Sequence, residues 1–273
     1  MSNKNLDEII NEDEESLYDN KLSDIFQLSA NIKSKSRLIR QEFGINDYYV
    51  CMADKNIVKD IRSLEDFLLE ALYFALKRPL VLIYNEEAFC LRQKFDGLEA
   101  SYFFDPVKAS KKELTKLEEL YKKGEIPDVN DDRKFSEMYR ISSEIKEKSF
   151  NVYLEDEGFS FYITDTSALG KNAEKILNYI SNLNKTDLER FSNITSLFSI
   201  IDTEKKKRYA ILSYNEGNAP RIKFSGTADS EEEYAGLNKI LEIAKESGQK
   251  FLSISKNTNN YSPKDDAPSD MYQ

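Results

Sequence analysis

The chain contains no histidine in its 273 residues. This absence excludes catalytic designs that need an imidazole base, including Ser-His-Asp and Cys-His hydrolysis, and it excludes the usual zinc sites with histidine ligands. A catalyst would therefore have to use carboxylates, Lys, Tyr or Cys. The 49 Asp and Glu residues provide many such groups, but abundance alone indicates no site.

Cysteine and glycine are also scarce. The two cysteines, Cys51 and Cys90, are too few for disulfide bonds to stabilise a chain of this length. Both lie in apolar runs typical of strands, so we expect reduced and buried thiols. A redox or nucleophilic role is the alternative, although a reactive thiolate usually needs a nearby cation or imidazole. The nine glycines argue against a nucleotide-binding fold that needs several in one loop.

Long apolar runs are absent too, and none approaches the roughly 18 residues that span a bilayer. The first residues lack the positive start and apolar core of a secretory signal. We therefore expect no membrane partner and a cytoplasmic location, either in a host cytoplasm or inside a virion if the source is viral. The preference for Lys over Arg, with many Asn, Ile and Tyr residues, is typical of an AT-rich genome of a bacterium, phage or large virus.

Charge is strongly biased toward the acidic side. The formal net charge of −10 and the isoelectric point near 4.9 predict long-range repulsion of nucleic acid and of anionic membranes. With 40% hydrophobic and 12% aromatic residues, the chain has enough apolar surface to offset its conformational entropy, so we expect most of it to fold.

The strand pattern predicts an α+β fold. Apolar segments separated by short polar turns read as three hairpins, formed by residues 80–84 with 88–91, 150–154 with 159–164, and 197–201 with 209–214. Because strands do not alternate strictly with helices, antiparallel hairpin and meander sheets with packed helices are favoured over a doubly wound parallel sheet.

Helix starts are indicated where a Ser or Thr precedes an acidic residue by three positions, the capping-box spacing. Such pairs begin at Ser63, Ser110, Thr186 and Ser230. The helix after Ser63 has an apolar face wider than one stripe, which suits either a core or an interface, and we favour a core.

The composition divides the chain into five segments. Residues 1–21 form an acidic arm, either loose or a short docked helix; residues 22–107 and 149–256 are α+β subdomains; residues 108–148 are a charged helical connector; and residues 257–273 are a disordered tail.

The segment 202–205 carries the best candidate for catalysis. Asp202, Glu204 and Lys205 follow an apolar run and are similar to the acidic-x-Lys pattern of metal-dependent nucleases, in which two carboxylates hold a cation and Lys orients water. The same segment also fits a polar turn between two strands, and we favour the turn. We therefore assign no metal ligand and no cofactor.

Two basic stretches are candidates for binding phosphate groups. The first comprises Lys205, Lys206, Lys207 and Arg208, and the second comprises Lys33, Lys35, Arg37 and Arg40. Solvated turn lysines explain the first equally well, and an ordinary helix surface is the favoured interpretation of the second.

Residues 165–172 connect a strand to a helix, which is where nucleotide-binding loops occur. The segment lacks the first glycine of a P-loop and has Asn172 where Ser or Thr would bind magnesium. We interpret it as an ordinary strand-to-helix connection.

These observations favour a non-catalytic protein-interaction protein, such as an adaptor, an accessory subunit or an assembly component of a bacterial or viral complex. Its expected partner is another protein. The alternatives are a metal-dependent phosphodiesterase or nuclease that uses Asp202, Glu204 and Lys205, and a nucleic-acid-binding accessory protein that uses the basic stretches.

Overall fold

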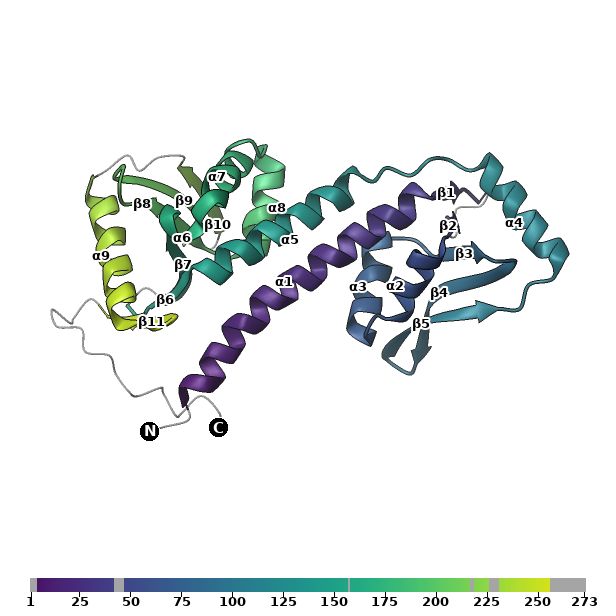
Figure 1. Cartoon of the computed structure of the whole chain (residues 1–273), viewed down its shortest axis with the longest axis horizontal. Coiled ribbons are helices and arrows are strands. Elements are labelled where there is room, and N and C mark those ends of the chain that lie inside the picture. Colours follow the sequence, from purple (N-terminus) through teal and green to yellow (C-terminus); the bar gives the residue numbers. More distant parts are fainter. Residues whose placement is uncertain (1–3, 42–46, 157, 217–218, 226–230, 256–273) are drawn as a thin grey trace. The chain divides into compact units, whose positions relative to one another are not determined.

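The computed structural model describes residues 4–41, 47–156, 158–216, 219–225 and 231–255 (Figure 1). The chain forms two compact units: unit 1 contains residues 1–19 and 139–273, and unit 2 contains residues 20–138. Both divisions fall inside helices, namely α1 (Lys4–Ser34) and α5 (Asn130–Lys148). Each unit therefore includes part of both helices.

Unit 2 is built on a five-stranded sheet with the order β1-β2-β3-β4-β5. The strands are β1 (Ser36–Ile39), β2 (Tyr48–Met52), β3 (Leu80–Tyr84), β4 (Glu87–Asp96) and β5 (Glu99–Val107). The predicted β3–β4 hairpin is confirmed, and its turn residues Asn85 and Glu86 have positive φ angles of 49° and 62°. Two consecutive residues with positive φ match the twist of a two-residue hairpin.

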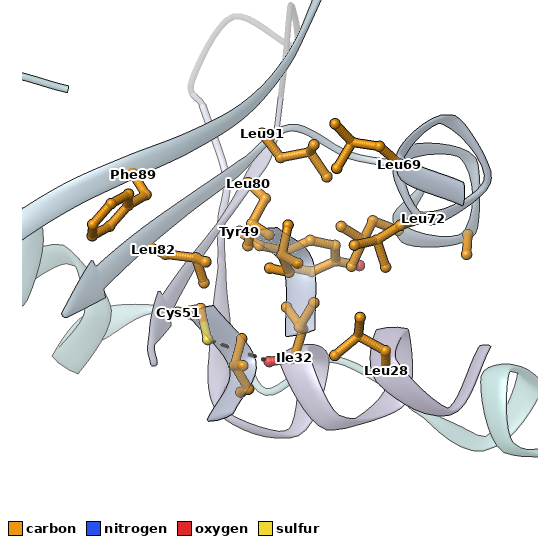
Figure 2. Packing of buried hydrophobic residues seen from close by; sticks show 14 of the residues in the cluster. Leu28, Ile32, Tyr49, Cys51, Leu69, Leu72, Leu80, Leu82, Phe89 and Leu91 are labelled. Carbon is orange, nitrogen blue, oxygen red and sulfur yellow. Dashed lines mark hydrogen bonds between the residues drawn. The ribbon is translucent and has the colours of Figure 1, made fainter. Parts of the chain in front are cut away.

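One face of this sheet packs against helices to form the core of unit 2. The helices are α1, α2 (Lys55–Arg62) and α3 (Asp66–Leu76). Figure 2 shows Ile32 of α1 and Leu72 of α3 packed near Leu80 and Leu82 of β3, and all four side chains are fully buried. Burial of each such side chain contributes about 1.5–3 kcal/mol relative to exposure.

On the opposite face, α4 (Lys111–Lys123) packs on β1 and β2, with Leu117 and Leu120 against Ile39 and Val50. The helix ends at Lys123, and Gly124 is its C-cap residue. A Cβ atom at Gly124 would lie 2.6 Å from the Arg37 Cβ atom, so only glycine allows this close approach of the chain to β1.

The capping-box predictions for unit 2 have mixed outcomes. Ser110 caps α4, and its hydroxyl and the Glu113 carboxylate accept each other's backbone N–H groups, as predicted. The helix start at Ser63 is wrong, because Ser63 ends α2 and donates its hydroxyl to the Asp60 carbonyl. Helix α3 begins at Asp66.

Unit 1 is built on a six-stranded sheet with the order β10-β9-β8-β7-β6-β11. The strands are β6 (Phe150–Leu154), β7 (Phe159–Asp165), β8 (Phe198–Asp202), β9 (Lys207–Glu216), β10 (Ala219–Ser225) and β11 (Phe251–Ile254). The predicted hairpins β6–β7 and β8–β9 are confirmed. Together the two units confirm an α+β fold, with mixed rather than purely antiparallel sheets, because β2–β3, β7–β8 and β6–β11 are parallel pairs.

Helices cover the sheet of unit 1. Helix α9 (Glu231–Ser247) lies along β7 and β8, where Leu241 packs on Ile163 and Ile201 (Figure 1). The crossover from β7 to β8 contains α6 (Thr166–Leu169), a 3-10 turn (Gly170–Asn172), α7 (Ala173–Ser181) and α8 (Lys185–Thr195).

The other helix-start predictions concern unit 1. The start at Thr186 is wrong, because Asn184 caps α8 by accepting the backbone N–H of Asp187. The predicted cap Ser230 lies outside the described residues, and so does the predicted tail over 257–273.

Polar residues line the contact between α1 and α5 within each unit. In unit 1, Ser16 bonds Ser143, and Asp19 accepts a bond from Ser142. In unit 2, Ser23 donates to the Ser136 carbonyl. We expected an acidic arm over 1–21, but residues 4–34 form one helix, and its buried positions between residues 16 and 23 include the polar Ser16, Asp19 and Ser23.

Candidate functional site

A cleft of about 940 Å³ opens at the carboxyl ends of β7 and β8 in unit 1. These strands are parallel, so their last residues, Asp165 and Asp202, reach the same edge of the sheet. Ligands commonly bind at the carboxyl ends of parallel strands. The structure thus brings together residues 165–171 and 202–205, which the sequence presented as separate candidates.

Asp165 is held by groups from three segments of unit 1. Its Oδ2 atom accepts bonds from the Thr203 hydroxyl at 2.6 Å and from Lys245 Nζ at 3.3 Å, and its Oδ1 atom accepts the Ser167 backbone N–H at 3.2 Å. Burial by itself raises the pKa of this carboxyl, but the donors outweigh it and the net pKa is lowered. Asp165 is therefore an ionised and structurally engaged carboxylate.

Asp202, Glu204 and Lys205 form the turn between β8 and β9. The Asp202 carboxylate is buried and accepts the Lys205 backbone N–H at 2.8 Å, while Lys205 Nζ lies 3.3 Å from Asp202 Oδ2. The bond to Asp202 raises the pKa of Lys205. Glu204 is exposed. The hydrogen bonds of Asp202 are those of a side chain that closes a turn.

The next feature is the arrangement of the carboxylates that a metal ion would need as ligands. In the part of the chain that the structure describes, no group of three or more Cys, Asp or Glu side chains could hold a metal ion. The two carboxylates of the 202–205 turn also differ, since one is buried and bonded to Lys205 and the other is exposed. The turn interpretation accounts for all three residues.

The inner side of the cleft is apolar. Leu177, Ile180 and Leu183 are half-buried residues of the crossover from β7 to β8, and they face a floor made by the buried Phe198 and Ile200 of β8. The cleft therefore combines apolar side chains with charged ones, of which Asp165 and Asp202 are buried and Glu174 and Glu204 are exposed.

The first basic stretch exposes three of its four cations. Lys205, Lys206 and Lys207 are exposed, whereas Arg208 is buried and its guanidinium lies 2.8 Å from the Glu233 carboxylate. Arg208 therefore contributes to the packing of α9 against the sheet.

The second basic stretch is engaged within unit 2. Lys33 is buried and bonds both oxygens of Asp132 at 2.8 Å, and Lys35 pairs with Asp54. These residues end α1 and precede β1.

The two arginines of this stretch are engaged as well. Arg37 lies 5.0 Å from the centre of the Tyr121 ring, and Arg40 pairs with Asp47 at 2.7 Å and Glu125 at 3.2 Å. Part of the stretch is strand β1 rather than the predicted helix surface, so its cations serve the fold of unit 2.

An aromatic surface on unit 2 was not singled out by the sequence. We define it as Phe67, Tyr73 and Phe74 of α3, Tyr102 of β5 and Phe95 of β4. The Tyr73 and Phe74 rings lie 5.3 and 5.9 Å from the Tyr102 ring. The sequence predicted a wide apolar face on this helix but not which residues remain exposed.

Solvent reaches much of this aromatic surface. Phe67, Phe74 and Phe95 are 39%, 59% and 66% exposed. Phe67 and Phe74 are seven residues apart, so they lie on the same side of the helix. Phe95 pairs with Ala100 and Gln93 pairs with Tyr102, which places Phe95 and Tyr102 on the same face of the hairpin.

No family model, no curated protein and no solved structure matches this chain. Among the described residues, no helix is long and apolar enough to cross a membrane. The cleft and the aromatic surface are therefore the features of the molecule from which a function can be inferred.

Proposed function

We propose that this chain is a non-catalytic protein-interaction protein, an adaptor, accessory subunit or assembly component of a bacterial or viral complex, which binds another protein through the aromatic surface of unit 2. It would act in the cytoplasm, or inside a virion assembled there. The observation that carries the proposal is the exposure of Phe74 and Phe95, at 59% and 66%.

The exposed Phe74 ring rests on the half-buried rings of Tyr73 and Tyr102. Contiguous apolar patches mark interaction sites, and aromatic residues are enriched at the centres of protein interfaces. Tyr73 and Tyr102 are half-buried and contact each other and Phe74. They would hold the Phe74 ring in place, so that little side-chain entropy is lost when Phe74 binds a partner.

The charges beside the aromatic surface indicate the chemistry of the partner. Glu70 is exposed on α3 between Phe67 and Phe74, Asp66 is exposed one turn earlier, and Lys21 Nζ lies 5.1 Å from the centre of the Phe67 ring. With a net charge of −10, the whole chain would also attract a basic protein at long range. We therefore expect an apolar contact on the partner surrounded by Lys or Arg residues.

Affinity isolation of the tagged full chain from its own cells tests this function. Phe74→Ser should reduce recovery of the bound protein at least about tenfold, because loss of a central aromatic anchor commonly costs 2 kcal/mol or more. Ile126→Ser is the matched control, since it removes an apolar side chain that is 78% exposed elsewhere in unit 2.

Both variants should unfold at the temperature of the unsubstituted chain, because their altered side chains are exposed. A partner recovered equally by all three chains, or no partner recovered by any, would contradict the proposal.

A further inference from the structure

We infer that the cleft of unit 1 is a binding site for a small amphipathic amine, with the apolar part of the ligand inside the cleft and its ammonium group at the rim. The inference is independent of protein binding by unit 2. Its basis is the combination of apolar side chains in the cleft, an excess of carboxylates over cations in its lining and a position at the carboxyl ends of two parallel strands.

The interior favours a hydrocarbon body. Leu177 and Ile180 on α7 face Phe198 and Ile200 on β8, and none of these four side chains offers a hydrogen bond. Binding an aliphatic or phenyl group there would remove apolar surface from water. The volume of about 940 Å³ falls within the range of about 300–1,000 Å³ that small-molecule sites occupy.

The rim favours a cation. The charged residues that line the cleft among the described residues are Asp165, Glu174, Asp202, Glu204, Lys171 and Lys205. Four carboxylates and two ammonium groups line the cleft, and Lys245, which pairs with Asp165 from outside the lining, brings the local formal charge to −1, which favours a cation over an anion of the same shape.

Internal pairing leaves two of these carboxylates as the best contacts for a ligand. Asp165 is paired with Lys245, and Asp202 is paired with Lys205. Glu174 and Glu204 are exposed residues from two different segments of the lining, namely α7 and the β8–β9 turn. They are therefore the residues to which we assign the ammonium group.

A matched pair of probes separates the contribution of charge from that of the apolar body. We would titrate the full chain with 4-phenylbutylamine and, separately, with 4-phenylbutyrate at neutral pH, and follow ligand resonances by saturation-transfer NMR. The probes share a hydrocarbon body and differ in the sign of the head group. We expect saturable binding of the amine, with a Kd at least about fivefold lower than that of the carboxylate.

Substitutions then locate the binding. Glu174→Gln combined with Glu204→Gln should weaken binding of the amine by about two- to fivefold per carboxylate, because each is an exposed ionic contact. Glu246→Gln is the control, since this exposed glutamate lies on α9 and is not part of the lining. It should leave the Kd unchanged.

Three results would overturn the inference. These are equal or tighter binding of the carboxylate, amine binding that the double substitution leaves unchanged, and no saturable amine binding up to roughly 10 mM, above the millimolar Kd expected of a fragment-sized ligand. None of these results bears on recovery of a protein partner through Phe74, so the two proposals fail separately.

Discussion

Burial and hydrogen bonding shift the pKa of the Asp165 carboxyl group in opposite directions. Burial disfavours the charge, and donors from Thr203, Ser167 and Lys245 favour it enough to lower the pKa. A strand that ends in Asp is visible in the sequence, but two of its donors come from the β8–β9 turn and from α9, which only the folded chain brings near. For this reason the sequence singled out the segment 165–172 but did not reveal the hydrogen bonds that the Asp165 carboxylate accepts.

Asp165→Asn should destabilise the chain in a pH-dependent way. Because the folded-state pKa is below the ordinary value of 3.8, the stabilisation is complete above that value and is lost as pH falls through the folded-state pKa. We expect a loss of about 1–3 kcal/mol at pH 7, measured by urea unfolding, since buried donors lose a charged acceptor.

The loss should shrink as the pH falls below about 4, where the unfolded-state carboxylate becomes protonated. A loss that stays constant between neutral pH and the acid limit would show that the substitution acts through packing alone.

The two thiols should differ in reactivity. Cys51 is buried in the core of unit 2, and burial raises its pKa to about 11 (Figure 2). Cys90 is only partly buried. We therefore expect Ellman's reagent to label Cys90 first and to label Cys51 only as the chain unfolds.

Cys90→Ser should remove the fast phase of this labelling, and Cys51→Ser should retain it. A fast phase that persists in Cys90→Ser would contradict the burial of Cys51. The sequence predicted reduced, buried cysteines, and the structure shows two free thiols of which one is fully buried.

At the scale of elements, the helix pair α1 and α5 shows where sequence patterns are least informative. Hairpins were predictable because their apolar strands alternate with short turns, and the α4 start was predictable because Ser110 and Glu113 bond locally. The inward side of α1 instead carries Ser16, Asp19 and Ser23, whose partners lie more than 100 residues away in the sequence. No local pattern reveals such partners.

The buried pair of Lys33 and Asp132 should stabilise this helix contact in unit 2 only while both members are present. Their side chains are 6% and 4% exposed. Lys33→Met should cost about 3–5 kcal/mol, because it leaves the Asp132 carboxylate buried without its cation. Lys33→Met combined with Asp132→Leu should recover much of that loss, measured as a double-mutant cycle in urea.

The exposed pair of Lys35 and Asp54 provides the control for this cycle. Its side chains are 44% and 47% exposed, so Lys35→Met should cost less than about 1 kcal/mol. Additive losses from Lys33→Met and Asp132→Leu would contradict the coupling between the buried charges.

At the scale of the whole molecule, the chain is organised differently from the five segments that composition suggested. The α+β class followed from the hairpins, but the division into units runs through α1 and α5, because contacts distant in sequence define each unit. The connector predicted over 108–148 supplies α4 to unit 2 and the last part of α5 to unit 1. Composition can divide the chain only into consecutive segments, whereas a compact unit can combine segments that are distant in the sequence.

The two proposed sites also differ in how much the sequence revealed. The cleft was partly visible, since its lining contains Asp202, Glu204 and Lys205, although their common edge with Asp165 depends on the parallel pairing of β7 and β8. The aromatic surface was not visible, because exposed and buried aromatic residues such as Phe74 and Phe89 look alike in a sequence.

The measurement that tests the central claim most directly is a covalent footprint of the chain within its native complex. The complex, isolated from the protein's own cells, and the free chain would be oxidised by hydroxyl radicals, and labelling at each aromatic residue would be quantified by mass spectrometry. We predict strong protection of Phe74, Phe95 and Tyr102 in the complex and unchanged labelling of Ile126. Equal labelling of the three aromatic residues in both samples would contradict protein binding through the aromatic surface.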